Sequence, residues 1–224
     1  MSVTTSTPTV PEPDQRVVLG QINWGQYLAI SNALVDRRNP RMIYLDGGLT
    51  ILVTSRRHDW YAETLGTLIV AVADGLGIPW EPAGQATYRR EDLEAGVEGD
   101  KTYYFGEHAD IMRGPVDIDL TTQPPPDLAI EVELTHPADV AVSVWGRLGV
   151  PEIWRFKAES GTLSFWTRRG DGRYERIERS LGLPALTPAD VMEQLRLADS
   201  LGSSRWYSQL RDWVRDVLRP RLGA

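Results

Sequence analysis

Apolar and polar residues alternate strictly in the segment PPPDLAIEVELT. Every second position from Leu128 to Leu134 is apolar, and Glu131 and Glu133 occupy positions between them. Because the side chains of a strand point alternately to opposite faces, this pattern predicts a strand with one wholly apolar face. Asp127 adds a third carboxylate to the other face, at a spacing of about 7 Å. A divalent cation bound among these like charges would remove their repulsion, so this segment is the first indication of function.

The remaining elements follow from helix periodicity and turn signals. Apolar residues at i, i+3, i+4 and i+7 predict a helix from about His58 to Leu76, with Ser55 as its N-cap. The turn Asp46-Gly47-Gly48 predicts a hairpin of strands 42–45 and 49–53. Further helices are predicted at 24–35, 138–148, 188–198 and 205–218. Further strands are predicted at 80–88, 102–105, 153–156, 162–166 and 174–177, with a loop at 89–99 and a charged connection at 106–123.

This order of elements predicts a mixed α/β fold. The strand at 128–134, the helix at 138–148 and the strand at 153–156 form a strand–helix–strand unit, which favours a parallel pair with a right-handed crossover. The helix at 205–218 is predicted to be amphipathic, with one apolar side formed by Trp206, Leu210, Trp213 and Val217.

Length and composition divide the chain of 224 residues into three parts. Residues 1–16 are rich in Ser, Thr and Pro and predict a disordered tail. Residues 17–198 are expected to form the main domain, and residues 199–224 to add a C-terminal amphipathic helix. The start of the chain lacks the regions of a signal peptide and no apolar run is long enough to span a bilayer, so we expect a cytoplasmic protein and no membrane partner.

Charge is distributed unevenly along the chain. From Glu91 to Asp139 there are 13 acidic and 2 basic residues, whereas from Arg147 to Ala224 there are 14 basic and 10 acidic residues. The acidic middle suits a hard cation, and the arginine-rich end suits phosphate groups. The chain has no cysteine and only 3 histidines, which excludes thiolate metal sites and disfavours a histidine-rich zinc site.

A structural interpretation of the acidic strand stands beside the metal hypothesis. The same alternation fits an antiparallel strand whose carboxylates face solvent, and the pattern alone does not decide between the two. Asp127, directly after three prolines, is more typical of a turn cap than of a ligand. His58 fits a helix-capping or surface position as well as a catalytic role, and Glu63 fits a solvated helix position.

Three segments, TYRREDLEAGVEGDKTYYF, VDIDLTTQPPPDLAIEVELTH and GRLGVPEIWRF, resemble the Uma-type family of restriction endonucleases within the PD-(D/E)xK nuclease superfamily. The resemblance runs from about Arg41 to Met192. It implies a restriction-endonuclease-like mixed β-sheet core flanked by helices, to which the C-terminal helix is added. It also implies a Mg²⁺- or Mn²⁺-dependent endonuclease that hydrolyses phosphodiester bonds in DNA, and a homodimer.

The resemblance assigns the acidic residues position by position. Asp100 matches the aspartate of the first motif and Glu131 the acidic residue of the second. Glu133 stands where a lysine is common, which makes it a further ligand or a general base. His58 and Glu63 match a region that carries a histidine and an extra acidic metal contact. Metal ligands are thus expected at Asp100, Glu131, Glu63 and the main-chain carbonyl of Val132.

Two departures from the family pattern bear on mechanism. Gly99 replaces the proline before the aspartate, and the lysine of the second motif is absent. Lys101, Lys157 and Arg147 are the candidates for the missing positive charge, with Lys101 the candidate catalytic residue among them. The absent lysine and the acidic net charge of −7 also fit an inactive nuclease-fold module that binds nucleic acid or a protein partner. A third hypothesis is a structural protein stabilised by a divalent ion.

Overall fold

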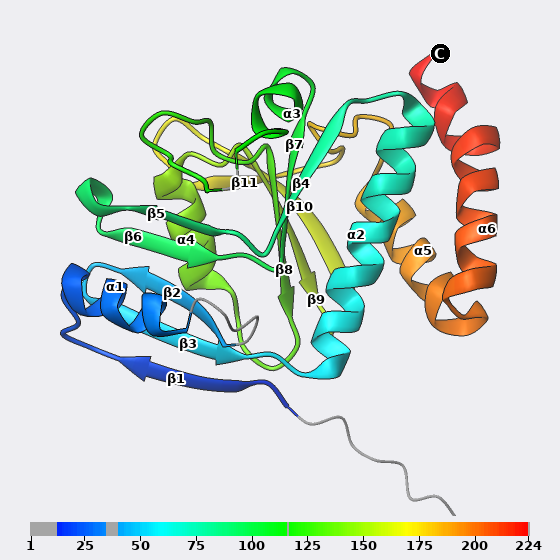
Figure 1. Cartoon of the computed structure of the whole chain (residues 1–224). Coiled ribbons are helices and arrows are strands. Elements are labelled where there is room, and N and C mark those ends of the chain that lie inside the picture. The colour runs from blue at the N-terminus through cyan, green and yellow to red at the C-terminus, as the bar shows by residue number, and fades with distance from the viewer. Residues whose placement is uncertain (1–12, 35–39, 116, 224) are drawn as a thin grey trace, which may run out of the picture.

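Two sheets form the centre of the molecule, and helices cover them (Figure 1). The computed structural model describes residues 13–34, 40–115 and 117–223. The larger sheet has the strand order β11-β10-β9-β8-β7-β4. Its strands are β4 (Trp80–Gly84), β7 (Lys101–Phe105), β8 (Leu128–Glu133), β9 (Glu152–Lys157), β10 (Thr162–Arg168) and β11 (Tyr174–Ile177).

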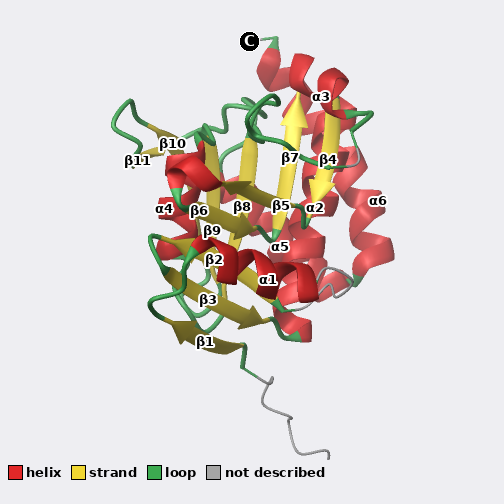
Figure 2. Cartoon of the chain, turned by 60° about the vertical axis from the view of Figure 1, so that its left-hand side comes forward, coloured by secondary structure: helices red, strands yellow, loops and turns green. Residues whose placement is uncertain are grey.

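The smaller sheet has the strand order β1-β3-β2-β6-β5 and lies across one side of the larger one (Figure 2). Its strands are β1 (Gln15–Leu19), β2 (Arg41–Leu45), β3 (Gly48–Val53), β5 (Thr87–Arg90) and β6 (Ala95–Glu98). The chain passes from this sheet to the larger one through the short turn between β6 and β7. The turn therefore lies where the two sheets meet.

The helices divide between the two sides of the larger sheet. Helix α4 (Asp139–Leu148) lies with the smaller sheet on one side, and α2 (Arg56–Leu76), α5 (Pro188–Leu201) and α6 (Ser203–Trp213) lie on the other (Figure 1). Helix α1 (Trp24–Ala33) packs on the smaller sheet, and α3 (Glu107–Met112) follows β7. The short turns η1 (Glu91–Leu93), η2 (Val214–Leu218) and η3 (Arg219–Leu222) complete the helical elements of the described residues.

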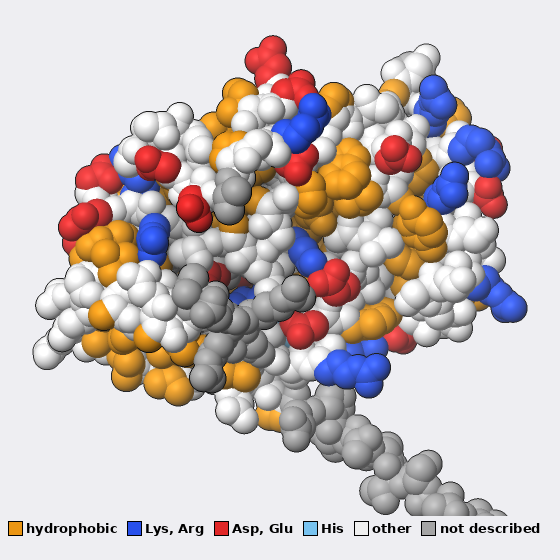
Figure 3. All heavy atoms as spheres, in the orientation of Figure 1, with side chains coloured by type: hydrophobic (Ala, Val, Ile, Leu, Met, Phe, Trp, Pro, Cys, Tyr) orange, Lys and Arg blue, Asp and Glu red, His pale blue; other side chains and the backbone are white. Residues whose placement is uncertain are grey.

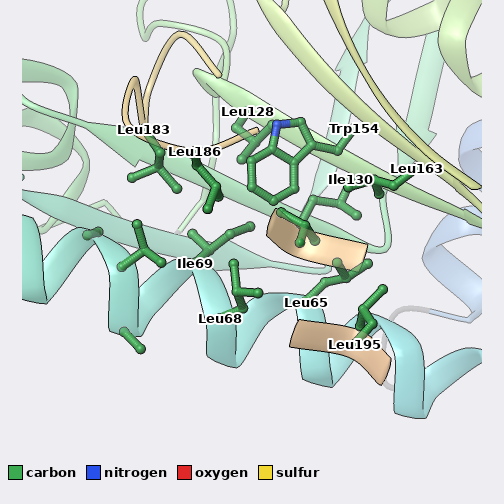
Figure 4. Close-up of a cluster of buried hydrophobic side chains, with 14 of the residues drawn as sticks. Leu65, Leu68, Ile69, Leu128, Ile130, Trp154, Leu163, Leu183, Leu186 and Leu195 are labelled. Carbon is green, nitrogen blue, oxygen red and sulfur yellow. The ribbon is translucent and has the colours of Figure 1, made fainter. Parts of the chain in front are cut away.

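Strand β8 is buried on both of its faces. It pairs in parallel with β9 and antiparallel with β7, and all six of its residues are buried. Leu128, Ile130 and Val132 point into the core against α2, part of which Figure 4 shows, while Ala129 belongs to the core around α4. The interpretation of its carboxylates as a solvent-facing row is therefore wrong. The parallel β8–β9 pair joined by α4 confirms the predicted strand–helix–strand unit.

Local signals for caps and turns were reliable. Asn23 forms a capping box with Gln26, and Ser55 accepts a hydrogen bond from the main-chain nitrogen of His58. Asp46 and Gly47 both have positive φ angles, 46° and 81°, which is the geometry of a tight hairpin turn. Helix α1 ends at Ala33, two residues before the predicted end, and residue 35 lies outside the described residues.

Two segments predicted without regular structure contain elements. Residues 89–99 hold the end of β5, the turn η1 and all of β6, and residues 106–123 hold α3. Strand β6 is short and contains Gly96, but it pairs with both β2 and β5. Helix α3 is a single short stretch with Ala109 and Met112 buried. Both depend on contacts with distant parts of the chain, so local pattern did not reveal them.

The C-terminal helices belong to the same core as the larger sheet. Trp206, Leu210, Val214 and Leu218 are buried in it, four residues apart, whereas Val217 is 44% exposed. The predicted apolar side was therefore wrong at Val217, because the helix widens into a π-helical turn at η2. Gln15 and Arg16, assigned from composition to the tail, lie in β1. In the described part of the chain, no helix is both long and apolar enough to cross a membrane.

Candidate active site

Asp100 lies in the turn between β6 and β7 and faces the end of β8. It is 3% exposed, and its Oδ2 accepts a hydrogen bond of 2.6 Å from the main-chain nitrogen of Val132. The N–H and C=O groups of one strand residue point to the same side. The carbonyl of Val132 therefore points to the same side of β8 as its N–H group, and the hydrogen bond ties the turn to the strand that carries Glu131.

Glu131 is buried in the same region. It is 7% exposed, and its Oε1 accepts a hydrogen bond of 2.6 Å from the indole Nε1 of Trp145 on α4. Burial raises the pKa of Glu131 to about 7, although Trp145 and the positive charge of Arg41 lower it. At neutral pH this carboxyl is poised between its two protonation states, which is unusual for a glutamate.

Gly99 allows this arrangement. A Cβ atom at position 99 would lie 2.7 Å from the ring of Trp145, closer than side chains pack. The absence of the proline expected before Asp100 therefore leaves space for the indole that binds Glu131.

Asp100 and Glu131 line one pocket, together with Val132, and its water-accessible volume is about 40 Å³. This volume exceeds the roughly 10–15 Å³ that one ordered water needs, so a few waters fit. Asp100 reaches the pocket from the β6–β7 turn, and Glu131 reaches it from strand β8. The other lining residues are Arg16, Ile43, Thr50, Leu52, His136, Pro137, Ala138, Val140 and Ala141.

His58 connects Asp100 to a second buried acid. Its Nε2 lies 3.0 Å from Asp100 Oδ1 and its Nδ1 lies 2.9 Å from Asp14 Oδ2. Burial raises the pKa of Asp14, but hydrogen bonds from His58 and from the main chain of Ser55 outweigh burial and lower it. The imidazole thus lies between the carboxylates of Asp14 and Asp100. His58 itself is not among the residues that line the pocket.

Arg41, the first residue of β2, brings a positive charge to the acids. It is 3% exposed, forms an ion pair with Asp100 and lies 3.6 Å from Asp59. Burial lowers the pKa of its guanidinium, and the charges of Glu131 and Asp59 raise it. Sequence reasoning missed this residue, because nothing local relates position 41 to position 100.

Glu133 is engaged with cations rather than with the pocket. Its Oε1 accepts a hydrogen bond of 2.7 Å from Arg155 Nε, and its Oε2 lies 3.9 Å from Lys157 Nζ. Arg155 also donates to Asp139 at 2.9 Å. Glu133 does not line the pocket. Arg155 was not among the predicted sources of positive charge, although the parallel register places it directly opposite Glu131.

The other predicted site residues lie to the side. Lys101 Nζ forms a 2.7 Å ion pair with Glu63, whose side chain is 69% exposed, and neither residue lines the pocket. Arg147 forms an ion pair with Asp46 on the β2–β3 turn. Asp127 accepts hydrogen bonds from the Phe105 nitrogen and from His108, as a structural cap does.

Two carboxylates at one small pocket fit a hydrated Mg²⁺ ion. This ion prefers oxygen ligands and is usually bound by one or two carboxylates while it keeps several waters. Among residues 13–34, 40–115 and 117–223 there is no group of three or more His, Asp or Glu side chains that could hold a metal. Asp100 and Glu131, with the carbonyl of Val132, are the ligand set that the geometry offers, and waters would supply the rest.

A comparison with protein families matches residues 24–200 to the Uma2 family, whose description is "Putative restriction endonuclease". The match covers more than half of the chain. The protein belongs to the Uma2 family. A search of curated proteins finds no match. Both pocket acids lie inside the matched region, whereas Asp14 and β1 lie before it and α6 lies after it.

Proposed function

We propose that this Uma2 family member is a divalent-metal-dependent endonuclease that hydrolyses phosphodiester bonds in DNA. The observation that carries the proposal is the shared pocket of Asp100 and Glu131, which come from different elements and line the same space. Restriction-endonuclease-like nucleases generally use divalent metals, and Mg²⁺ or Mn²⁺ suits this oxygen-only site.

In this mechanism Asp100, Glu131 and the Val132 carbonyl would hold the metal ion. A divalent ion held there would lower the pKa of a bound water and neutralise phosphate charge. Because burial raises the pKa of Glu131 to about 7, Glu131 would have to lose its proton at or below neutral pH to act as a ligand. Trp145 fixes Oε1 of Glu131 and so directs the remaining oxygen.

His58 and Asp14 orient Asp100. Their contacts of 3.0 and 2.9 Å form a chain of buried polar groups that fixes the Asp100 carboxylate in the turn. Arg155 supplies the positive charge beside the second motif, where family resemblance expects a lysine. Glu133 holds Arg155 in place through the 2.7 Å hydrogen bond. In this proposal Glu133 is a positioning residue.

The acidic pocket does not attract DNA by itself, since the phosphates repel the carboxylates. Figure 3 shows Lys and Arg side chains gathered over α6 on the face in view. The exposed arginines of α6, η2 and η3 are Arg205, Arg211, Arg215, Arg219 and Arg221. We propose this helix as a contact for the DNA backbone, and a cytoplasmic homodimer as the form that cuts both strands.

Cleavage of plasmid DNA with Mg²⁺ or Mn²⁺ tests the proposal. Wild-type protein is expected to cut, and Asp100→Ala and Glu131→Ala are expected to lose cleavage while remaining folded by circular dichroism. Glu178→Ala, which removes an exposed acid on β11's C-terminal flank, serves as the matched control and is expected to cut normally. Absence of cutting by wild type, or full activity of both variants, contradicts the proposal.

A second candidate function is a nuclease-fold module that binds nucleic acid or a protein without catalysis. Its support is that Arg41 and Arg155 already compensate acids of the site without a metal. Titration calorimetry separates the two functions. Binding of DNA or of a protein partner without uptake of Mg²⁺ or Mn²⁺ favours the module, and metal uptake abolished by Glu131→Gln favours the enzyme.

A further inference from the structure

Arg41 is a buried cation inside an acidic cluster. The residue is 3% exposed, and arginine is almost never so buried unless it is paired. The guanidinium reaches from the start of β2 to Asp100, the acid of the β6–β7 turn. Five carboxylates act on it, from five separate positions in the chain: Asp14, Asp59, Glu98, Asp100 and Glu131.

Several acids share the charge of this guanidinium. It pairs directly with Asp100 through one terminal nitrogen, and its other terminal nitrogen lies 3.6 Å from Asp59. By contrast, the partly buried Arg155 donates hydrogen bonds of 2.7 and 2.9 Å to Glu133 and Asp139, away from the pocket. A second cation bound by Asp100 would therefore take over charge compensation that Arg41 now provides.

Arg41 and a metal ion at Asp100 and Glu131 would compete for the same negative charge. Two like charges a few ångströms apart repel strongly in a buried site, where water screens them poorly. Removal of Arg41 without a replacement would leave buried carboxylates uncompensated, which is costly. The acid pair therefore needs one compensating positive charge, and Arg41 supplies it when no metal ion is bound.

We propose that Arg41 is the internal counter-ion of the Asp100–Glu131 site, and that a divalent ion binds by displacing its charge from Asp100. This inference extends the proposed function and depends on it only for the presence of a metal ion at the site. Arg41 keeps the acid pair compensated when metal is scarce and lowers the affinity of the site for metal. The affinity of the wild-type site is thus set by this competition.

The test is titration of Mn²⁺ alone, followed by electron paramagnetic resonance at pH 8, with full-length protein. Arg41→Met keeps most of the side-chain volume and removes the charge. It is expected to bind Mn²⁺ at least about tenfold more tightly than wild type. Arg41→Lys keeps the charge and is expected to bind close to the wild-type affinity. Arg147→Met, whose arginine pairs with Asp46, is the matched control and is expected to leave the affinity unchanged.

Thermal stability measured without metal is a second test, and it remains informative if Arg41→Met folds poorly. Arg41→Met is expected to melt at a lower temperature than wild type at pH 8. Asp100→Asn combined with Arg41→Met is expected to melt higher than Arg41→Met alone, because the uncompensated charge is then gone. A double variant no more stable than Arg41→Met overturns the inference.

The outcomes separate this inference from the nuclease proposal. If wild type cuts DNA but Arg41→Met binds Mn²⁺ no more tightly than wild type, the counter-ion role is overturned and the nuclease proposal stands. Tighter binding by Arg41→Met in a protein that never cuts DNA supports the counter-ion role and removes the nuclease function. Absence of Mn²⁺ binding in every variant overturns both.

Discussion

Glu131 and Glu152 are two buried glutamates on neighbouring parallel strands, and the contrast between them identifies the site. Each accepts a hydrogen bond from a tryptophan indole, at 2.6 Å from Trp145 and 2.7 Å from Trp154. Burial raises the pKa of both carboxyls. Residue type, burial and the direction of the pKa shift therefore do not distinguish the two glutamates.

Their other partners differ. Glu152 is 0% exposed and also accepts hydrogen bonds from the Ser180 hydroxyl and from the main-chain nitrogens of Leu181 and Gly182. It thus ties β9 to the loop before α5. Among the described residues, Glu131 accepts a hydrogen bond only from the indole of Trp145, and it lines a pocket that it shares with Asp100. Glu152, whose oxygens accept four hydrogen bonds from the protein, is therefore structural, whereas Glu131, which faces a pocket, is a candidate ligand.

The largest difference is expected in DNA cleavage. Glu131→Gln removes a proposed metal ligand and is expected to lower the rate of plasmid cleavage by a factor on the order of 100 or more. Glu152→Gln, assayed at a temperature where it is folded, is expected to cut at a rate within a few-fold of wild type. Equal rates for the two variants would remove the functional distinction.

The next largest effect concerns stability. Glu152→Gln places an amide against donors that need acceptors, and buried donors left unsatisfied cost about 1–3 kcal/mol each. We therefore expect the free energy of unfolding to fall by roughly 3 kcal/mol or more, measured by urea denaturation at pH 8. A change below about 1 kcal/mol would mean that the loop is not held by this carboxylate.

Glu131→Gln is expected to act in the opposite direction at pH 8 without metal. The pKa of Glu131 is about 7 in the folded protein, above its ordinary value of 4.5. The folded state therefore binds this proton more tightly, and its stabilising contribution is lost as pH rises from about 4.5 to 7. Glu131→Gln should be more stable than wild type at pH 8 by on the order of 2 kcal/mol, with little difference at pH 4.5. Equal pH profiles from urea denaturation would contradict the raised pKa.

The smallest effect is expected at Trp145. Trp145→Phe removes the indole donor, which lowers the pKa of Glu131 in the wild type, so the pKa should rise further. The pH midpoint of Mn²⁺ binding should then move upward by roughly one unit or less, since a neutral hydrogen bond contributes about 1 kcal/mol. Trp206→Phe, which loses a bond to Gln194 far from the pocket, is the matched control.

The sequence predicted the parts of the site that lie close together in the chain. The alternation around Glu131, the cap at Ser55 and the turn at Asp46 are local signals, and the structure confirms them. Family resemblance singled out Asp100, which the structure brings to the same pocket as Glu131.

The missed residues act across long separations in the chain. Asp14 contacts His58, 44 positions away, and Arg41 reaches Asp100 from another sheet. Their roles depend on how β1 and β2 sit against the β6–β7 turn, which no local pattern encodes. Of the predicted positive charges, Lys157 lies 3.9 Å from Glu133, but Arg155 and Arg41 make closer contacts with the acids. Those two positions become neighbours of the acids only through strand register and sheet packing.

Crystals soaked in Mn²⁺ test the central claim most directly, through anomalous scattering from the metal. The account predicts one strong peak within coordination distance of both Asp100 and Glu131, with the Arg41 guanidinium moved away from Asp100. A peak that lies instead at Glu63 or at Glu133, with the pocket between Asp100 and Glu131 empty of metal, would contradict it.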